Sequence, residues 1–323
     1  MDEGRLDFYF FPVALDKFRP FSLINFDLYI KVENRFVLYK HRNITITKDD
    51  IHTLQENNVL YLYVQNKERK SFRQYAENNI EEILKDPTVS LNVKATYIYE
   101  SAFNVVEDIF KEPRSEGNIQ RARGIINHTV DFIFSDSGAF VNLLQIRAHD
   151  YYTYTHSVNV CTFSVALANR IGITNPTTLK EVGLGALLHD VGKSKIDSRI
   201  INKPSALSPS EWEEMKKHPL YGVEIVQGTE AGGETVFSVI SQHHEKVDGS
   251  GYPQGLKEHQ LSIYGKISSI CDVYDAITTN RSYSVARTPM EAAQFMLSRK
   301  ENFDPTLLKH FFELFAFKKT TPP

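Results

Sequence analysis

The adjacent pair His189-Asp190, with Lys193 three residues later, combines residue types that can bind metal and phosphate. An imidazole beside a carboxylate can hold a divalent metal ion, and an ammonium group can meet a phosphate as a point charge. The pair alone is weak support, because it occurs by chance in many proteins and could be an ion pair at a helix end. It gains weight from further candidate ligands along the chain, which are His156, His218, His243, His244 and Asp272.

The number of candidate ligands predicts two metal ions. A catalytic site with one ion takes about three protein ligands, so five histidines and two aspartates exceed its needs. Asp190 would then be a bridging carboxylate. Two ions about 3.5–4 Å apart can clamp a phosphodiester and lower the pKa of a shared water toward about 7. Ligation by histidine and aspartate without cysteine favours iron, with manganese next, over structural zinc.

Taken one at a time, these residues have simpler explanations. A lone histidine such as His156 is more often buried with one hydrogen bond, and His243-His244-Glu245 could be a solvated stretch before a loop. Asp272 is harder to explain in this way, because apolar residues flank it on both sides. An unpaired carboxylate in such surroundings would cost several kcal/mol. We therefore expect a cation beside Asp272.

Composition limits the class of protein. A length of 323 residues suits two domains, and a formal net charge of −3 gives no basic field for extended nucleic acid. The apolar run at residues 8–15 is interrupted by Pro12 and is too short to span a membrane, and nearby acidic residues contradict a signal peptide. Cys161 and Cys271 lie in apolar helical context, which predicts buried free thiols. We expect a cytoplasmic protein without membrane insertion.

Residues 1–80 are predicted to form a small α/β domain. Thr47 with Asp50 has the spacing of a capping box for a short helix that Asn57 would end. The segment contains no histidine cluster and no glycine-rich phosphate loop, so we interpret it as a regulatory or partner-binding domain. Enrichment in β-branched and aromatic residues predicts strands at 27–32, 35–39, 44–46 and 59–64.

The pattern becomes helical from about residue 72. Apolar residues recur at helical spacing to about residue 84 and again over 94–112, and 118–147 is a further helical candidate. Residues 81–147 are predicted to be a helical connector between two domains. The sequence therefore predicts a two-domain protein whose second part is all-α.

Residues 148–317 are predicted to be almost wholly helical. Apolar residues from 158 to 171 indicate a buried helix that Gly172 ends. Residues 184–191 indicate a second buried helix, which Gly192 is predicted to close.

The segment Ser208-Pro-Ser-Glu211 is a favourable helix start, with serine at the cap and proline at the first position. That helix is predicted to end at His218, because Pro219 disfavours helical geometry in the residue before it. A metal-binding side chain at a helix terminus, such as that of His218, can project freely from the helix.

From about residue 148 to 300 the chain resembles the HD-GYP family of cyclic dinucleotide phosphodiesterases. The resemblance rests on six blocks in family order and spacing. They are Tyr152-Thr-Tyr-Thr-His156-Ser157, His189-Asp190-Val-Gly-Lys193, His218-Pro219-Leu-Tyr-Gly222, His243-His244-Glu245-Lys-Val-Asp248-Gly-Ser-Gly251-Tyr252-Pro253, Asp272-Val-Tyr-Asp275-Ala276 and Arg281-Ser-Tyr283.

The resemblance implies an HD-type helical bundle with defined site residues. Catalysis would rest on Asp190 and Lys193, with Lys193 near the scissile phosphate. Gly251 and Tyr252 would shape the pocket mouth and contact substrate, and Arg281 would contact a substrate phosphate. The metal ligands it implies are His156, His189, Asp190, His218, His243, His244 and Asp272.

These residues together predict a phosphodiesterase. The resemblance implies that it would hydrolyse cyclic di-GMP to linear pGpG, and further to GMP, by attack of a hydroxide held between two metals. The amino-terminal segment more loosely resembles a domain often found ahead of such catalytic regions. Protein partners are expected at the amino-terminal domain and at the Gly251-Tyr252-Pro253 loop.

The chain departs from the family pattern at two positions. Some members carry a glutamate where this chain has Tyr152 and hold a third metal with it, so Tyr152 predicts two metals. Members usually carry a lysine or arginine where this chain has Ser284, so one phosphate anchor is missing. Two alternatives stay open: a catalytically weak or inactive receptor or signalling adaptor for a cyclic dinucleotide, and an HD hydrolase for another cyclic dinucleotide or a mononucleotide.

Overall fold

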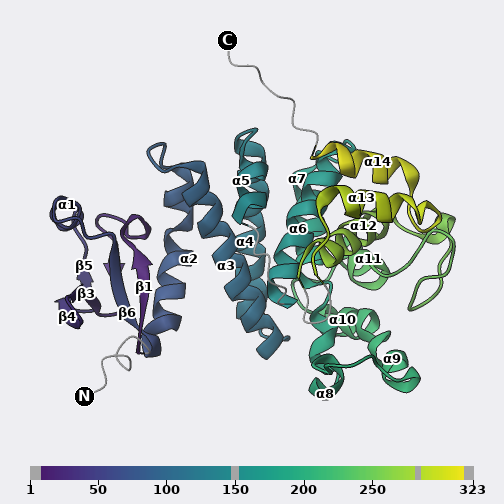
Figure 1. The fold of residues 1–323 in the computed structure, drawn as a ribbon, viewed down its shortest axis with the longest axis horizontal. Helices are drawn as coiled ribbons and strands as arrows, with labels where there is room; N and C mark the ends of the chain where they lie inside the picture. The colour runs from purple at the N-terminus through teal and green to yellow at the C-terminus, as the bar shows by residue number, and fades with distance from the viewer. Residues whose placement is uncertain (1–8, 147–152, 281–284, 316–323) are drawn as a thin grey trace, which may run out of the picture. The chain divides into compact units, whose positions relative to one another are not determined.

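The computed structural model describes residues 9–146, 153–280 and 285–315 (Figure 1). The chain divides into two compact units, residues 1–89 and 90–323. Among the described residues, no helix is both long enough and apolar enough to cross a membrane.

The first unit carries a four-stranded antiparallel sheet with strand order β1-β6-β3-β4. Two short strands, β2 and β5, form a separate antiparallel pair. The elements are β1 (Phe10–Ala14), β2 (Leu23–Ile24), β3 (Leu28–Val32), β4 (Arg35–Lys40), β5 (Ile44–Thr45), α1 (Lys48–Glu56), β6 (Tyr61–Gln65) and α2 (Arg69–Lys85), with 3-10 turns η3 (Leu15–Lys17) and η4 (Asn66–Glu68). The predicted mixture of strands and helix in this region is confirmed.

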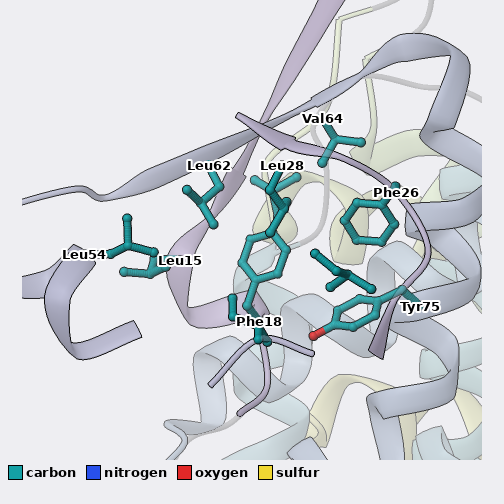
Figure 2. Packing of buried hydrophobic residues seen from close by; sticks show 11 residues of the cluster. Leu15, Phe18, Phe26, Leu28, Leu54, Leu62, Val64 and Tyr75 are labelled. Carbon is teal, nitrogen blue, oxygen red and sulfur yellow. The ribbon is translucent and has the colours of Figure 1, made fainter. Parts of the chain in front are cut away.

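Aliphatic side chains and three buried aromatic rings together make the core of the first unit. Figure 2 shows Phe18, Phe26 and Tyr75 converging with aliphatic residues of β3 and β6. Tyr75 lies on α2, and its hydroxyl accepts a hydrogen bond from the Arg19 backbone amide at 2.9 Å. This contact and the surrounding apolar packing attach α2 to the sheet. Helix α2 therefore runs through residue 80 as part of the first unit.

The start of α1 is a capping box, as predicted. The Thr47 hydroxyl accepts a hydrogen bond from the Asp50 amide at 3.1 Å, and the Asp50 carboxylate accepts one from the Thr47 amide at 2.6 Å. Two amides that the helix itself cannot satisfy are thus paired. Asn57 caps the other end, and Asn58 follows with a positive φ of 56°.

The second unit is helical in the residues described apart from turns, loops and isolated bridge residues, among them the pair Asp248 and Lys257. Four helices form a closed ring in which α6 packs on α7, α7 on α11, α11 on α12 and α12 on α6. Every residue from Thr155 to Ala168 of α6 is buried. The helices are α3 (Leu91–Lys111), α4 (Glu116–Ser135), α5 (Ala139–Ile146), α6 (Thr153–Arg170), α7 (Pro176–Leu188), α8 (Ser198–Ile201), α9 (Pro209–Met215), α10 (His218–Val226), α11 (Glu234–Gln242), α12 (Ile263–Thr278), α13 (Pro289–Leu297) and α14 (Pro305–Glu313), with 3-10 turns η5 (Val191–Lys195), η6 (Glu258–Gln260) and η7 (Lys300–Asn302).

The helix predicted over 118–147 is in fact two helices. Helix α4 ends at Ser135 and α5 begins at Ala139. Between them the Asp136 carboxylate accepts a hydrogen bond from the Gly138 amide at 2.6 Å. An aspartate that binds the backbone two residues on forms a turn in place of a helical hydrogen bond, and this local competition separates the helices.

The prediction for His218 was wrong about which helix holds it. Helix α9 ends at Met215, and His218 is the first residue of α10, with Pro219 at the second position. Proline is tolerated in the first turn, because amides there have no partner within the helix. His218 still lies at a helix terminus, but at the amino end of α10.

Gly192 does not close α7, which ends at Leu188. It lies in η5, whose backbone is pressed against α10. A Cβ on Gly192 would lie 1.9 Å from the His218 carbonyl oxygen and 2.5 Å from the Gly222 amide nitrogen. Only glycine permits this approach, which fixes the segment after His189-Asp190 against the helix that begins at His218.

We predict that Gly192→Ala separates η5 from α10. A side chain forced into filled space costs about 1–3 kcal/mol or more, so the midpoint of thermal unfolding and the metal content should both fall. Gly124→Ala is the matched control, since nothing lies within 4 Å of its added Cβ on α4. That change should leave stability unchanged or raise it slightly. Equal behaviour of the two variants in calorimetry and elemental analysis would contradict the argument.

Candidate metal centre

The structure brings all seven predicted ligand residues together at the ends and inner faces of the ring helices. His156 comes from α6 and Asp272 from α12, while His189 and His243 cap the carboxyl ends of α7 and α11. Their ligand atoms form two groups, and within each group the atoms lie within 4.8 Å of one another. One group is Asp190, His218, His243 and His244, and the other is His156, His189 and Asp272.

Backbone carbonyls determine which nitrogen of three imidazoles carries the proton. The Nδ1 atoms of His189, His218 and His243 lie 2.7, 2.8 and 2.8 Å from the carbonyl oxygens of Ala186, Met215 and Ile240. A carbonyl can only accept, so each Nδ1 donates. In the neutral ring the Nε2 lone pair is then left for a metal. Each acceptor lies three residues before its histidine.

The free lone pairs point at one another. His218 Nε2 and His243 Nε2 are 3.1 Å apart, and His189 Nε2 lies 3.2 Å from His156 Nε2. His218 and His243 both donate from Nδ1, so no proton is available between their Nε2 atoms while the rings are neutral. Two facing lone pairs repel unless a cation lies beside them. The arrangement therefore suits bound metal ions.

Asp190 spans the two groups. Its Oδ1 lies 3.3 Å from His218 Nε2 and 3.9 Å from His243 Nε2. Its Oδ2 lies 3.4 Å from His189 Nε2 and 3.9 Å from His156 Nε2. Oδ1 is buried with no hydrogen-bond donor among the described residues, as expected where its neighbours are unprotonated nitrogens. A buried carboxylate oxygen without a donor is costly, and a cation would satisfy it.

Asp272 also reaches both groups. Its Oδ1 lies 3.0 Å from His156 Nε2, and its Oδ2 lies 3.3 Å from His244 Nδ1. The sequence-based expectation that a cation partner lies beside this carboxylate is consistent with its placement among imidazoles.

The protonation states suit metal ligation. Burial lowers the pKa of His218 and His243, and it lowers the pKa of His244 to about 3. These three rings are thus neutral near pH 7. Burial alone would raise the pKa of Asp190, but Lys193 and His189 hold it well below its usual range. Neutral imidazoles beside ionised carboxylates are the forms that bind metal.

The donor set fits divalent metal ions bound by nitrogen and oxygen. Neither group includes a thiol. Cys161 and Cys271 are buried and free, as predicted, and burial raises the pKa of Cys161 to about 12. Thiols that stay protonated do not compete as ligands.

A buried hydrogen-bonded chain supports His156. Its Nδ1 lies 2.8 Å from Asp275 Oδ2, while Asp275 Oδ1 accepts a hydrogen bond from the Asn159 amide at 2.9 Å. Tyr99 on α3 donates to Asn159 Oδ1 at 3.0 Å. A carboxylate behind a ligating histidine fixes its ring and tautomer. The chain thus connects α3 to the candidate metal centre.

Lys193 and the Gly251-Tyr252 loop lie at the more open side of the site. Lys193 Nζ is 2.6 Å from Asp190 Oδ2, and its side chain is partly exposed. The ring of Tyr252 lies over that of His244, with centroids 4.6 Å apart. Burial raises the pKa of Tyr252, with Asp272 and Asp190 adding to the effect, so its hydroxyl stays protonated.

The structure gives Gly251 a backbone role that the motif did not reveal. A Cβ there would lie 2.5 Å from Glu245 Cα and 2.6 Å from the His244 carbonyl oxygen. The Tyr252 amide donates to that same carbonyl at 3.2 Å. The absence of a side chain lets the loop lie directly on the ligand-bearing segment.

Three predicted positions lie outside the described residues, namely Tyr152, Arg281 and Ser284. Nothing in the structure tests the predictions attached to them.

Asp275 and Glu245 both lie within the blocks that resemble the HD-GYP family, but the sequence alone assigned neither of these carboxylates its supporting role. Asp275 lies three residues after Asp272, a spacing that puts both on one helix face, and this was the available signal. Glu245 accepts hydrogen bonds from the Gln254 and Leu256 amides at 2.7 and 3.0 Å. It anchors the loop that follows Tyr252, and it carried no comparable local signal. Asn159 and Tyr99 become recognisable only through their contacts.

Comparison with known proteins concerns mainly the helical unit. A family model described as an HD domain matches residues 139–307. A cyclic di-GMP phosphodiesterase of Pseudomonas aeruginosa is 33% identical over 208 residues, which are 64% of this chain and 50% of that protein. A 3'3'-cGAMP-specific phosphodiesterase of Vibrio cholerae is 32% identical over 204 residues, which are 61% of this chain and 39% of that protein. The chain thus spans half or less of the length of these curated relatives.

A solved structure extends the likeness to most of the chain. An HDG"Y"P protein from Bdellovibrio bacteriovorus matches with a TM-score of 0.68 and 27% sequence identity, and the match covers 95% of this chain and 100% of that chain. The resemblance predicted from the six sequence blocks is confirmed.

We predict that Asp275→Asn weakens metal binding. The substitution removes the charge opposite His156 Nδ1, and loss of such support typically costs about 10- to 100-fold in metal affinity. Competition against a metal-binding dye under anaerobic conditions measures the change. Asp131→Asn, at an exposed position of α4, should leave the affinity unchanged. Unaltered affinity in the Asp275 variant would refute the supporting role.

Proposed function

Since the chain belongs to the HD domain family over residues 139–307, we propose that it is a metal-dependent phosphodiesterase acting on cyclic di-GMP. The products are the linear dinucleotide pGpG and, by a second cleavage, GMP. The observation that carries the proposal is Asp190, whose two carboxylate oxygens face separate histidine groups. Relatives named as cyclic di-GMP phosphodiesterases support the choice of substrate.

Two divalent ions fit the residues present, iron first and manganese next by the chemistry of the ligands. Bound ions at such a site acidify water and neutralise phosphate charge. Asp190, whose oxygens lie near both histidine groups, would help to hold both ions. In this proposal the remaining ligands are His218, His243 and His244 for one ion and His156, His189 and Asp272 for the other.

The chain's own residues would bind and orient the phosphodiester. Lys193 holds a positive charge 2.6 Å from the bridging carboxylate, where it can stabilise charge that develops on the phosphate. The protonated Tyr252 hydroxyl can donate to a phosphate or ribose oxygen beside His244. Gly251 keeps that loop against the ligand segment. Arg281 remains our proposed second phosphate contact.

We retain the predicted division of labour along the chain as part of the proposal. Residues 1–80 would regulate the enzyme or bind a partner, and residues 148–317 would catalyse phosphodiester hydrolysis. Residues 81–147 would connect these two domains. Hydrogen bonding of Tyr99 toward His156 supports a route by which the connector could act on the site. The protein would work in the cytoplasm, where its nucleotide substrate occurs.

A second candidate substrate has its own support. A relative that is 32% identical is named as specific for 3'3'-cGAMP, which shares the cyclic backbone but replaces one guanine with adenine. The receptor alternative rests on Ser284, where a cationic phosphate anchor is missing.

We predict that the protein purified without oxygen contains two equivalents of metal and converts cyclic di-GMP to linear product. Asp190→Ala should lose metal and turnover together, because it removes the shared ligand. Elemental analysis and chromatography of products from cyclic di-GMP and 3'3'-cGAMP measure both quantities.

Asp131→Ala serves as the matched control and should keep both properties. Full turnover by the Asp190 variant would exclude the mechanism. If metal-loaded wild type binds the nucleotide but forms no linear product, the receptor hypothesis is favoured. If it cleaves 3'3'-cGAMP but not cyclic di-GMP, the substrate assignment changes to 3'3'-cGAMP.

We predict that Lys193→Met keeps the metal but slows catalysis. Removing one group that stabilises developing charge typically costs about 10²- to 10³-fold in kcat. Steady-state kinetics at matched metal content measure the loss. A variant with normal kcat would show that Lys193 only neutralises Asp190.

A further inference from the structure

One exposed tryptophan lies beside the loop at the candidate metal centre. Trp212 on α9 is 44% exposed and is the single tryptophan of the sequence. Its ring centroid is 5.7 Å from that of Tyr252, with the planes at 76°. Tyr252 in turn lies over His244. The three rings form a row that leads from a candidate ligand toward the surface.

The row begins at the most exposed of the candidate ligands. The side chains of six of the seven are at most 7% exposed, whereas that of His244 is 23% exposed. Lys193 is 19% exposed. Among the described residues of the site, His244 and Lys193 are thus the more exposed ones, and the rings of Tyr252 and Trp212 follow His244 in the row.

Trp212 keeps exposed ring surface beside Tyr252. It is 44% exposed, and an edge-to-face pair covers at most one face of each ring, so Tyr252 by itself does not enclose the indole. Helix α9 is fixed by a capping box between Ser208 and Glu211 and by the hydrogen bond from His218 Nδ1 to the Met215 carbonyl. Trp212 lies one turn before Met215. Its position is thus tied to that of a candidate ligand.

We propose that Trp212 stacks on a purine base of the cyclic dinucleotide whose phosphate lies at the metal centre. This inference rests on the proposed function, since it takes the substrate class from there. Purine bases stack on tryptophan faces, and loss of one such contact typically weakens binding about 5- to 100-fold. The phosphate would be held by the buried charges, and Trp212 would select a substrate that carries a base.

The competing explanation is that Trp212 only braces Tyr252. A brace would affect every phosphodiester alike, whereas a stacking residue affects substrates that carry a base. Bis(p-nitrophenyl) phosphate has no base and reports on the metal centre alone, so the ratio of the two activities separates the explanations.

The test compares Trp212→Ala and Trp212→Phe with wild type in metal-loaded full-length protein. We expect Trp212→Ala to raise KM for cyclic di-GMP by about 5- to 100-fold, far more than for bis(p-nitrophenyl) phosphate. Trp212→Phe should recover most of the loss. Leu220→Ala, at a residue that is 43% exposed on α10, should change neither activity. Equal losses on both substrates would show a brace and overturn the proposal.

Fluorescence gives a second measurement that does not depend on turnover. Because Trp212 is the only indole, a phosphorothioate analogue of cyclic di-GMP should quench the emission of wild type and saturate. Saturable binding by another method without quenching would overturn the proposal.

The outcomes also separate this inference from the proposed function. In one outcome, wild type does not cleave cyclic di-GMP, but cyclic di-GMP inhibits its hydrolysis of bis(p-nitrophenyl) phosphate. If this inhibition is weaker in Trp212→Ala, the stacking proposal stands and the substrate assignment fails. If wild type cleaves cyclic di-GMP and Trp212→Ala leaves KM unchanged, the function stands and stacking fails.

Discussion

The Asp190 carboxylate, enclosed by imidazoles, is the interaction on which the helical unit depends. Each of its oxygens faces the Nε2 atom of a histidine from a different group, and Oδ1 has no hydrogen-bond donor among the described residues. Without cations, the buried charge and the facing lone pairs would destabilise the fold. With cations, the same atoms become a rigid shared ligand set. Metal binding would therefore be coupled to helix packing, since the candidate ligands come from helices that pack around one another.

One local device is used three times to orient the ligands. A histidine at or beside a helix end donates from Nδ1 to the carbonyl three residues earlier, as His189 does to Ala186 and His243 does to Ile240. Helix ends leave carbonyls without partners, so the contact satisfies the backbone and fixes the tautomer together. His218 repeats it across the junction of α9 and α10. The close approach at Gly192 then holds this junction beside Asp190.

The residues that support the candidate ligands lie far from them in the sequence. Asp275 holds His156 across 119 positions of sequence, and Tyr99 reaches Asn159 across 60. A change in the position of α3 would thus be transmitted to His156 through three hydrogen bonds, by way of Asn159 and Asp275. Tyr252 and Trp212 extend outward from His244, and our proposals assign phosphate binding to the buried charges and base recognition to Trp212.

The amino-acid sequence by itself determined the element types and the ligand chemistry. Strand and helix periodicity, the Thr47 capping box and the histidine and aspartate blocks are local patterns, and local backbone energetics enforce them. The apolar pattern did not capture the turn at Asp136, where a side-chain hydrogen bond replaces a helical one and separates α4 from α5. It also did not capture that proline is tolerated in a first helical turn, which is why His218 begins α10. Only the tertiary structure decided which oxygen of Asp190 faces which imidazole, and that Asp275, Asn159 and Tyr99 stand behind His156. Those contacts join residues far apart in the chain, and they exist because the packing of whole helices fixes distances that no local spacing encodes.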